Sequence, residues 1–425
     1  MQCLVTSRRL VVSAMVLGGG LIGSAPTWSQ TALDEWFTQA MSTLVLNHRF
    51  EFVDDEANDL DSASASTLRA FLGYSTAERA GFSVHVGLEG VLHVGLDDFN
   101  VPGETSEGFD VVADPEGIEF DEAYFAYKGL PDTTLKVGRQ YVSFRKAPHH
   151  RFVGPVPWRQ NWQSMDAVRL VNKSIADLTV DYVYVHNVSR IFGENNDNEA
   201  LANSPMNSHL LNVKYGGLRF GEIEGFYYRL DYDNDALPAP FTDRGTLGVK
   251  FQGGAQLSER MKFLYLAEIS QQSAFGDNPS AFDSADQYRV EAGLKFGTGF
   301  TAKLAYEVLE SSNGVSFSTP LATVHAFQGW ADRFIGFPGG GVEDLYVVGL
   351  STLPGSIKMM TTFHNYQSAA DGIDYGSEFN IQFTKKIQRF TLQLKHASYF
   401  GDDDPAAGAL AFDKTITWFT TRWAM

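Results

Sequence analysis

The chain of 425 residues has a single cysteine, Cys3, and contains no long uninterrupted apolar run after residue 29. One cysteine excludes a disulfide framework and a zinc site built from thiolates. A helical membrane span needs about 20 consecutive apolar residues, and no later stretch approaches that length. The sequence therefore excludes disulfide-rich secreted folds and proteins that cross a membrane as helices.

Basic residues are also scarce. The chain has 33 lysines and arginines against 51 aspartates and glutamates, which gives a formal net charge of -18. Nucleic-acid binding depends on basic residues that face phosphates, so this balance excludes a nucleic-acid partner. Hydrophobic residues make up 44% of the chain, an ordinary share that excludes a disordered protein.

The N-terminus has the pattern of a secretory signal peptide. Arg8 and Arg9 precede an apolar stretch at 10–22, and small residues follow up to Ser29. A basic start, a short apolar core and a small-residue exit are typical of a cleaved export signal. The apolar core is too short for a membrane anchor. We therefore expect residues 1–29 to be a signal peptide that is removed on export.

From residue 44 onward, apolar and polar residues alternate with a period of two. Phe82, Val84 and Val86, for example, share one face of a strand, while Ser83 and His85 share the other. Runs of this kind predict eighteen strands, each of about ten residues. The connections between them alternate between short turns rich in Gly, Pro, Lys and Ser and segments that are mostly long.

An even number of strands with alternating short and long connections is typical of a transmembrane up-and-down antiparallel β-barrel. A soluble β-sandwich has no reason to place its long loops at one end. We therefore expect an all-β barrel of about 18 strands over residues 44–425, with short periplasmic turns and long extracellular loops. Ahead of it, residues 30–43 form a lead-in, in which Trp36, Phe37 and Met41 at roughly helical spacing indicate a short helix.

These features place the protein in the outer membrane of a Gram-negative cell. Its expected partners are outer-membrane lipid, lipopolysaccharide and the barrel-assembly machinery. Residues 97–122, in a predicted outer loop, hold ten acids and no lysine or arginine. Such loops are solvated and can bridge to lipopolysaccharide phosphates through divalent cations. No segment has the spacing of a dedicated calcium loop, and we predict no metal site and no cofactor.

The strand faces turned away from lipid carry both signs of charge. A barrel of this size is too wide for side chains to fill, so its polar face implies a water-filled or loop-plugged lumen. One interpretation is that these charges pair across strands and keep the lumen wet. The other is a track for an anionic solute, because rings of arginine or lysine favour anions.

One segment reverses the acidic trend, because residues 133–165 contain no acid at all. Their basic and aromatic residues include Arg139, Arg145, Arg151, Trp158 and Arg159. Guanidinium groups match carboxylates bidentately and aromatic faces stack on sugar rings, so this loop is a candidate constriction for a carboxylated sugar. Alternatively, the acidic segment 97–122 neutralises it and the loop has a packing role.

The sequence resembles the alginate-export porins of Gram-negative outer membranes along nearly the whole chain after residue 29. The segments that carry the resemblance are Asn-His-Arg-Phe-Glu at 47–51, residues 66–74, Val-Gly-Arg-Gln at 137–140, and residues 151–161, 325–334 and 375–378. The family implies a barrel of the same kind, with loops folded over the pore and an arginine-rich constriction that passes a polyuronate. By position, that role would fall on Arg49, Arg69, Arg139, Arg151 and Arg159.

The candidate solute pathway follows from the inward face, the basic segment and the resemblance together. It consists of Arg49, Glu51, Arg69, Arg139, Arg145, Arg151, Trp158, Arg159, Arg169 and Arg289. The segment 325–334 adds a loop motif of His325, Gly329, Trp330 and Asp332. These residues predict a passive channel for anionic saccharides, which either exports an alginate-like polyuronate, with periplasmic export partners, or takes up oligouronates.

Three alternatives stay open at this point. A general diffusion pore would have the same barrel without a dedicated substrate site, and a structural or adhesive barrel would conduct no sugar. A barrel enzyme would need a nucleophile and a base. Because no Gly-x-Ser-x-Gly elbow or comparable motif is visible, we expect no enzymatic activity.

Overall fold

The computed structural model describes residues 36–104, 108–147, 150–233, 242–276, 283–322 and 324–425. The predicted signal peptide and the first residues of the lead-in lie outside these ranges. In the described part of the lead-in, residues 36–38 are helical and strand begins at Met41. Pairing of Met41 with Ser75 on the neighbouring strand commits this segment to the barrel before the expected start at residue 44.

The wall of the barrel consists of eighteen strands. They are β1 (Met41–Asp55), β2 (Ala63–Ser75), β3 (Phe82–Asp98), β4 (Gly117–Leu130), β5 (Thr133–Gln140), β6 (Ser164–Asn172), β7 (Leu178–Ser189), β8 (Asn203–Leu218), β9 (Gly221–Leu230), β10 (Arg244–Ser258), β11 (Met261–Ala274), β12 (Ser284–Phe296), β13 (Thr301–Leu309), β16 (Val342–Leu353), β17 (Ile357–Gln367), β18 (Asp374–Ile387), β19 (Phe390–Gly401) and β20 (Lys414–Ala424). Outside the wall lie a small hairpin, β14 (Ser311–Ser312) and β15 (Val315–Ser316), the helix α2 (Glu199–Ala202) and the 3₁₀ helices η1 (Pro354–Ser356) and η2 (Pro405–Ala411). Among the described residues, no helix is long and apolar enough to cross a membrane.

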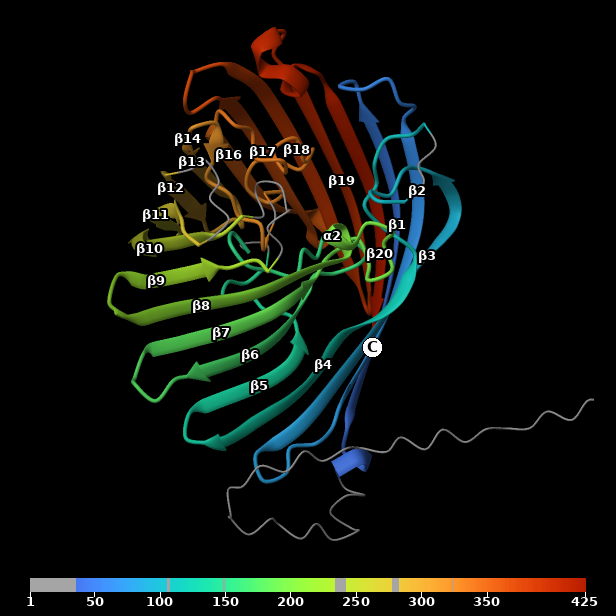
Figure 1. Ribbon diagram of the computed structural model, residues 1–425. Helices are drawn as coiled ribbons and strands as arrows, with labels where there is room; N and C mark the ends of the chain where they lie inside the picture. The colour runs from blue at the N-terminus through green and yellow to red at the C-terminus, as the bar shows by residue number, and fades with distance from the viewer. Residues whose placement is uncertain (1–35, 105–107, 148–149, 234–241, 277–282, 323) are drawn as a thin grey trace, which may run out of the picture.

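The sheet closes on itself. Each strand pairs antiparallel with the wall strands before and after it, and β13 pairs directly with β16 across the excursion of the small hairpin. The ring closes where β1 pairs with β20, from Val45↔Ala424 to Asp55↔Lys414. Figure 1 shows the blue strand β1 beside the red strand β20. The predicted fold, an up-and-down antiparallel barrel, is confirmed.

The connections differ between the two ends of the barrel. At one end the strands are joined by short turns, such as 131–132 and 259–260, while the other end includes the loops 141–163 and 310–341. β1 begins and β20 ends at the short-turn end. In barrels of this type the short turns are periplasmic and the long loops are extracellular.

Alternate residues of each strand face opposite sides of the wall. Phe52, Leu72 and Val347 lie outside and are 44–52% exposed, whereas Glu51 and Arg69 lie inside and are almost fully buried. A barrel with an apolar outer band and a polar interior is suited to lipid on its outside. The protein is therefore located in the outer membrane.

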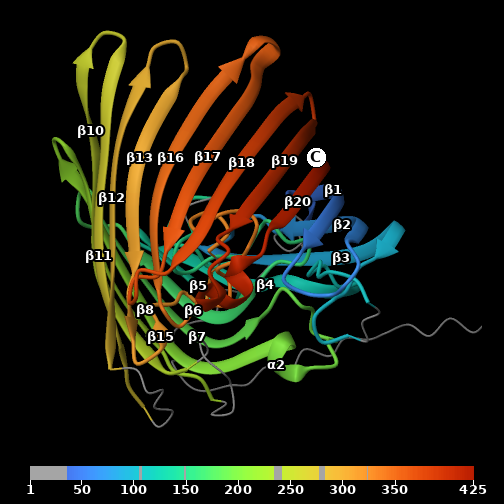
Figure 2. The ribbon, with the colours of Figure 1, turned by 90° about the horizontal axis from the view of Figure 1, so that it is seen from above.

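Two long loops fold back into the barrel, where Figure 2 shows them inside the ring of strands. We call residues 141–163 the first inner loop and residues 310–341 the second inner loop. Val153 of the first forms a β-bridge with Leu321 of the second, and the Gly154 N–H donates to the Leu321 carbonyl at 3.0 Å. Gln163 Nε2 donates to the carbonyls of Gly154 and Leu321, at 2.9 Å each. The two loops are therefore joined to each other inside the lumen.

Apolar side chains fix the same loops to different parts of the wall. Phe152 and Phe317 pack in one cluster with Phe226 of β9, and Phe334 packs in another with Tyr366 of β17. Burying an aromatic side chain of this size stabilises by about 1.5–3 kcal/mol. The inner loops are thus built into the core of the barrel.

The division of the wall into two faces predicts opposite outcomes for adjacent residues of β16. We expect Val347→Arg, on the lipid face, to lower the free energy of unfolding by about 2–4 kcal/mol, because it places a charge in hydrocarbon. Val348→Arg points into the lumen beside Lys303 and Thr362 and should cost much less. Denaturant unfolding in liposomes measures both, and equal losses would contradict the assignment of faces.

Candidate functional site

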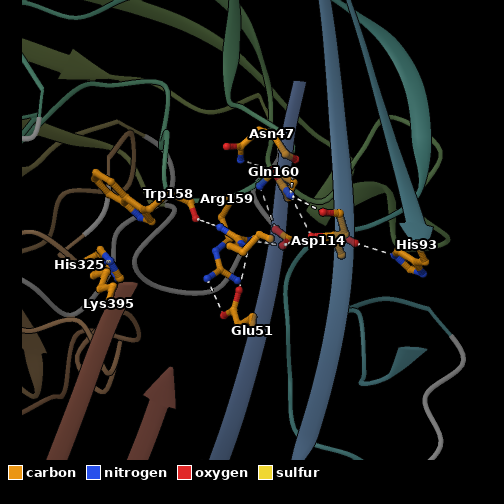
Figure 3. A network of polar contacts seen from close by, with 11 residues as sticks. Asn47, Glu51, His93, Asp114, Trp158, Arg159, Gln160, His325 and Lys395 are labelled. Carbon is orange, nitrogen blue, oxygen red and sulfur yellow. Dashed lines mark hydrogen bonds and ion pairs between the residues drawn. The ribbon is translucent and has the colours of Figure 1, made fainter. Parts of the chain in front are cut away.

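The first inner loop reaches the wall at β1 and β2 through a set of buried polar residues, shown in Figure 3. Arg159 Nη2 pairs with Glu51 Oε1 at 2.9 Å, and Arg49 pairs with Glu51 at 3.2 Å. Gln160 Nε2 donates to the carbonyl and the hydroxyl of Thr67, each at 3.0 Å. This end of the loop is therefore held by two arginines that share one carboxylate.

Asp114 completes this anchor, although the sequence analysis did not select it. It is fully buried, forms an ion pair with Arg49 and accepts a hydrogen bond from the Gln160 backbone N–H at 2.9 Å. Burial on its own raises the pKa of the Asp114 carboxyl, but the Arg49 and Arg159 guanidiniums outweigh it, so the pKa lies below its usual value. The signal was present in the sequence, since Asp114 belongs to the acidic segment 97–122 that we weighed as a partner of the basic loop.

The other end of the first inner loop is anchored on the wall formed by β9 to β13. Arg151 pairs with Glu307 at 2.9 Å and donates to Gln328 Oε1 at 3.0 Å. Arg145 pairs with Glu224 at 3.0 Å and also with Glu268. Each of these carboxylates is buried, and breaking such a pair by removing one partner leaves an uncompensated charge. The loop thus crosses the lumen and is fixed on both sides.

The remaining pathway arginines on the inward face are also paired. Arg69 forms ion pairs with Glu89 and with Asp121, the latter at 3.6 Å, and Arg169 pairs with Asp181 at 2.6 Å. Arg289 donates to the Tyr346 hydroxyl at 3.1 Å and lies 3.5 Å from Glu291. Arg69, Arg169 and Arg289 are therefore neutralised locally, in keeping with the interpretation that lumen charges pair.

Arg139 lies apart from the other predicted pathway residues. It continues the outward series of Leu135 and Val137 on β5 and pairs with Asp166 at 2.8 Å and with Glu194. Because side chains alternate along a strand, this parity places Arg139 at the outer rim of the wall and not in the lumen. Its assignment to the solute pathway is therefore corrected.

The loop motif forms a junction between the second inner loop and the wall. His325 Nδ1 lies 2.8 Å from Asp332 Oδ1, its Nε2 contacts Lys395 of β19, and its ring stacks on Trp158 with centroids 5.1 Å apart. Burial lowers the pKa of His325 to about 4, so the ring is neutral at pH 7. The junction joins both inner loops to β19.

Gly329 and Trp330 explain the turn that follows. Gly329 has φ of 89°, and a Cβ there would collide with the Glu378 carboxylate and the Tyr366 hydroxyl. The backbone N–H groups of Trp330 and Ala331 both donate to Glu378 Oε1, the second at 3.0 Å. Only glycine gives this turn its backbone conformation and its close approach to β18.

A cavity of about 190 Å³ lies beneath this junction, on the wall formed by β19, β20 and β1. Its lining residues are Asn47, Arg49, Pro157, Trp158, His325, Thr391, Gln393, Lys395, Trp418, Thr420 and Arg422. Three of them are cations and none is a carboxylate. We call this space the loop cavity. Lys395, Trp418 and Arg422 were not among the predicted site residues, although their parity places them on the inward face.

The strand register explains the arrangement of the cations. Arg422 of β20 lies between Thr391 of β19 and Asn47 of β1, and Arg49 lies beside Thr420 one row further from the periplasm. Rows on one face are two residues apart, or about 7 Å along the strand.

Within the part of the chain that is described, no group of three or more His, Cys, Asp or Glu residues is placed to hold a metal ion.

Comparison with known proteins identifies the class of fold. No family model and no curated protein matches the sequence. Among solved structures, Pseudomonas aeruginosa OpdK with vanillate is 10% identical with a TM-score of 0.69, over 92% of this chain and 99% of that one. Acinetobacter baumannii OccAB2 is 14% identical with a TM-score of 0.68, over 92% and 99% of the two chains.

Pseudomonas aeruginosa OccK9 (OpdG) gives a similar result, with 12% identity and a TM-score of 0.68 over 92% of this chain and 100% of that one. At such low identity, these similarities concern the fold. The protein has the eighteen-stranded architecture of the Occ and Opd outer-membrane porins. No family model supports the narrower resemblance to alginate-export porins.

Removing the partner of Arg151 tests the anchoring of the first inner loop. We expect Glu307→Gln to destabilise the docked loop by about 3–5 kcal/mol, because Arg151 then stays buried without an opposing charge. Hydrogen exchange of the Phe152 to Gly154 amides should rise, and single-channel current should become noisier. Glu343→Gln is the matched control, because the Glu343 carboxylate accepts a hydrogen bond from the exposed side chain of Gln367. Equal exchange in the two variants would contradict the anchor.

Acid should loosen the second inner loop. The pKa of His325 falls from 6.5 to about 4 on burial, so the released loop binds a proton that the docked loop excludes. The contribution of His325 is complete above pH 6.5 and is lost as the pH falls toward 4. Current noise recorded between pH 7.5 and 4 measures it, and His325→Gln, which stays neutral, should flatten the profile. An unchanged profile in that variant would assign the effect to other groups.

Proposed function

We propose that the protein is a passive outer-membrane channel for anionic saccharides, either exporting an alginate-like polyuronate or taking up oligouronates. The observation that carries this proposal is the loop cavity, in which Arg49, Lys395 and Arg422 line one space with Trp158 and Trp418 and no carboxylate lines it. Cations in a pore favour anions, and aromatic faces suit sugar rings. The cavity adjoins the first inner loop, as expected of a constriction.

The cations of the loop cavity differ in how far they are already neutralised. Arg49 pairs with Glu51 and Asp114, whose carboxylates lie outside the lining, and Lys395 contacts His325. Arg422 forms no ion pair with any of the described acids, and its neighbours in the register are Thr391 and Asn47. Arg422 is therefore the guanidinium best placed to bind a carboxylate of the solute, and its fork geometry permits two parallel hydrogen bonds.

The resemblance to alginate-export porins supports a polyuronate as the solute. The vanillate bound to OpdK is a ring that carries a carboxylate, and a uronate shares that combination. A general diffusion pore is the second candidate, favoured by the local pairing of most lumen arginines. The proposal involves transport without chemistry, so it requires no cofactor and no catalytic residue.

The partners of the barrel belong to the same proposal. The outer loops carry acidic runs, such as Asp402, Asp403 and Asp404 between β19 and β20, which suit divalent cations bridged to lipopolysaccharide phosphates. Assembly would use the barrel-assembly machinery of the cell. In the export direction, periplasmic partners would deliver the polymer to the short-turn end.

Arg422→Gln tests the solute site in planar bilayers. We expect block by a trimeric uronate to weaken about tenfold or more, because one charge-assisted hydrogen-bond pair contributes about 1.5–3 kcal/mol. Anion selectivity should fall as well. Lys386→Gln is the matched control, since Lys386 pairs with Thr391 at the same level of the wall but does not line the cavity.

Two results would contradict the proposal. Equal weakening by Lys386→Gln would mean that only the total lumen charge matters, which favours the general pore. No block of the unmodified protein by uronates of any length, together with unrestricted passage of neutral sugars, would remove the anionic saccharide as the solute. Substitution of Arg151 or Arg159 is less informative, because both arginines hold the first inner loop in place.

A further inference from the structure

A second and larger cavity, of about 480 Å³, lies on a different part of the wall, at the periplasmic ends of β4, β5 and β6. It is lined by Lys128, Leu130, Asp132, Thr133, Thr134, Lys136, Arg169, Val171 and Lys173. The turns at 131–132 and 173–177 form its edge, so it opens at the short-turn end of the barrel. We call it the mouth cavity.

The lining of the mouth cavity is strongly basic, with four cations and one acid. Arg169 pairs with Asp181 at 2.6 Å, and Lys128 pairs with Glu78 at 3.5 Å through side chains that are about half exposed. Lys136 donates to the Tyr124 hydroxyl at 3.2 Å. Neither Lys136 nor Lys173 forms an ion pair with a described acid, so the cavity keeps an excess of positive charge.

The strand register concentrates this charge. Lys136 of β5 lies directly opposite Arg169 of β6, and like charges at opposed positions of an antiparallel pair destabilise the sheet. Both side chains share the inward face with Thr134, whereas Val137 on the same strand faces outward. Asp181 already pairs with Arg169, so an anion bound in the cavity would mainly offset the charge of Lys136.

The mouth cavity is separate from the loop cavity. The two share no lining residue, and β2 and β3 lie between their walls. On those intervening strands, Arg69 is neutralised by Glu89. The wall therefore carries two basic regions with a neutralised region between them.

We propose that the mouth cavity is a second anion-binding site, at which carboxylate or phosphate groups bind on the periplasmic side of the inner loops. Lys136 and Lys173 supply the free charge, and Arg169 and Thr134 lie within the same lining. Clustered cations in a concave, low-dielectric wall raise the local concentration of anions and their rate of association. The site would make association faster from the periplasm than from outside. This inference does not require the solute to be a saccharide.

The test is single-channel recording of the full-length barrel with known orientation. A biotin attached at Asp403→Cys, in the outer loop between β19 and β20, marks the extracellular side when streptavidin is added. A trimeric uronate is then added to one side at a time. In the double variant Lys136→Gln/Lys173→Gln, we expect the association rate of block from the periplasmic side to fall about tenfold, within the range of electrostatic steering. Block from the outer side should change less than about twofold, and high salt should remove the difference between the proteins.

The matched control is the double variant Lys262→Gln/Lys295→Gln. These two lysines are directly paired at the same end of the barrel, on β11 and β12, and neither lines a cavity described above. The control removes the same charge at a similar depth. An equal loss in the control, or equal losses from both sides in the test variant, would overturn the proposed site. Heat-dependent electrophoretic mobility shows whether each variant is folded.

Inorganic phosphate separates this inference from the proposed function. If the uronate blocks from neither side, the saccharide proposal fails, and the mouth cavity is judged from the reversal potential in a phosphate gradient. A reversal potential that shifts toward cation selectivity in Lys136→Gln/Lys173→Gln, but not in the control, would support a phosphate-binding site. An unchanged reversal potential would overturn it. If both probes respond, the site binds the chemistry that carboxylates and phosphates share.

Discussion

Hydrocarbon offers no partner to a backbone N–H or carbonyl, and each unpaired group there costs several kcal/mol. A sheet in the membrane must therefore have no edge. The pairing of β1 with β20 meets this requirement by joining the first and last strands of the wall. Three other features depend on this closure: the apolar outer and polar inner faces of the strands, the width of the lumen, and the alternation of turns and loops.

Closure creates a second problem, because a ring of eighteen strands encloses more space than wall side chains can fill. The protein fills part of it with two loops that are bonded to each other and to the wall. Their polar contacts are buried arginine–carboxylate pairs, such as Arg151 with Glu307 and Arg159 with Glu51. Removing either partner of such a pair leaves an uncompensated charge in the interior. These pairs therefore fix the path of a loop more strictly than apolar contacts do.

This use of arginine explains why the predicted pathway was only partly informative. The basic segment lies in the lumen, where Arg145, Arg151 and Arg159 act as anchors with acidic partners. Glu51, the partner of Arg159, lies 108 residues away in the chain, so the pairing depends on the fold. The resemblance placed Arg139 in the pathway, but β5 pairs with β6 without a register shift, so Arg139 keeps the outward parity of Leu135 and Val137. Some cations that line the cavities form no ion pair with a described acid, Arg422 and Lys136 among them, and their significance came only from the register of adjacent strands.

The sequence by itself determined the class of fold, because the alternation of apolar and polar side chains and the spacing of turns are local properties. Apolar side chains partition into lipid and polar ones toward water, whatever the rest of the fold does. It also determined which segment would be basic and which acidic. Only the tertiary structure decided which charges cancel. Coulomb attraction depends on the distance between side chains and on burial, and both are set by strand register and by the return of the loops into the lumen. The net acidity of the chain therefore coexists with two basic cavities in its interior.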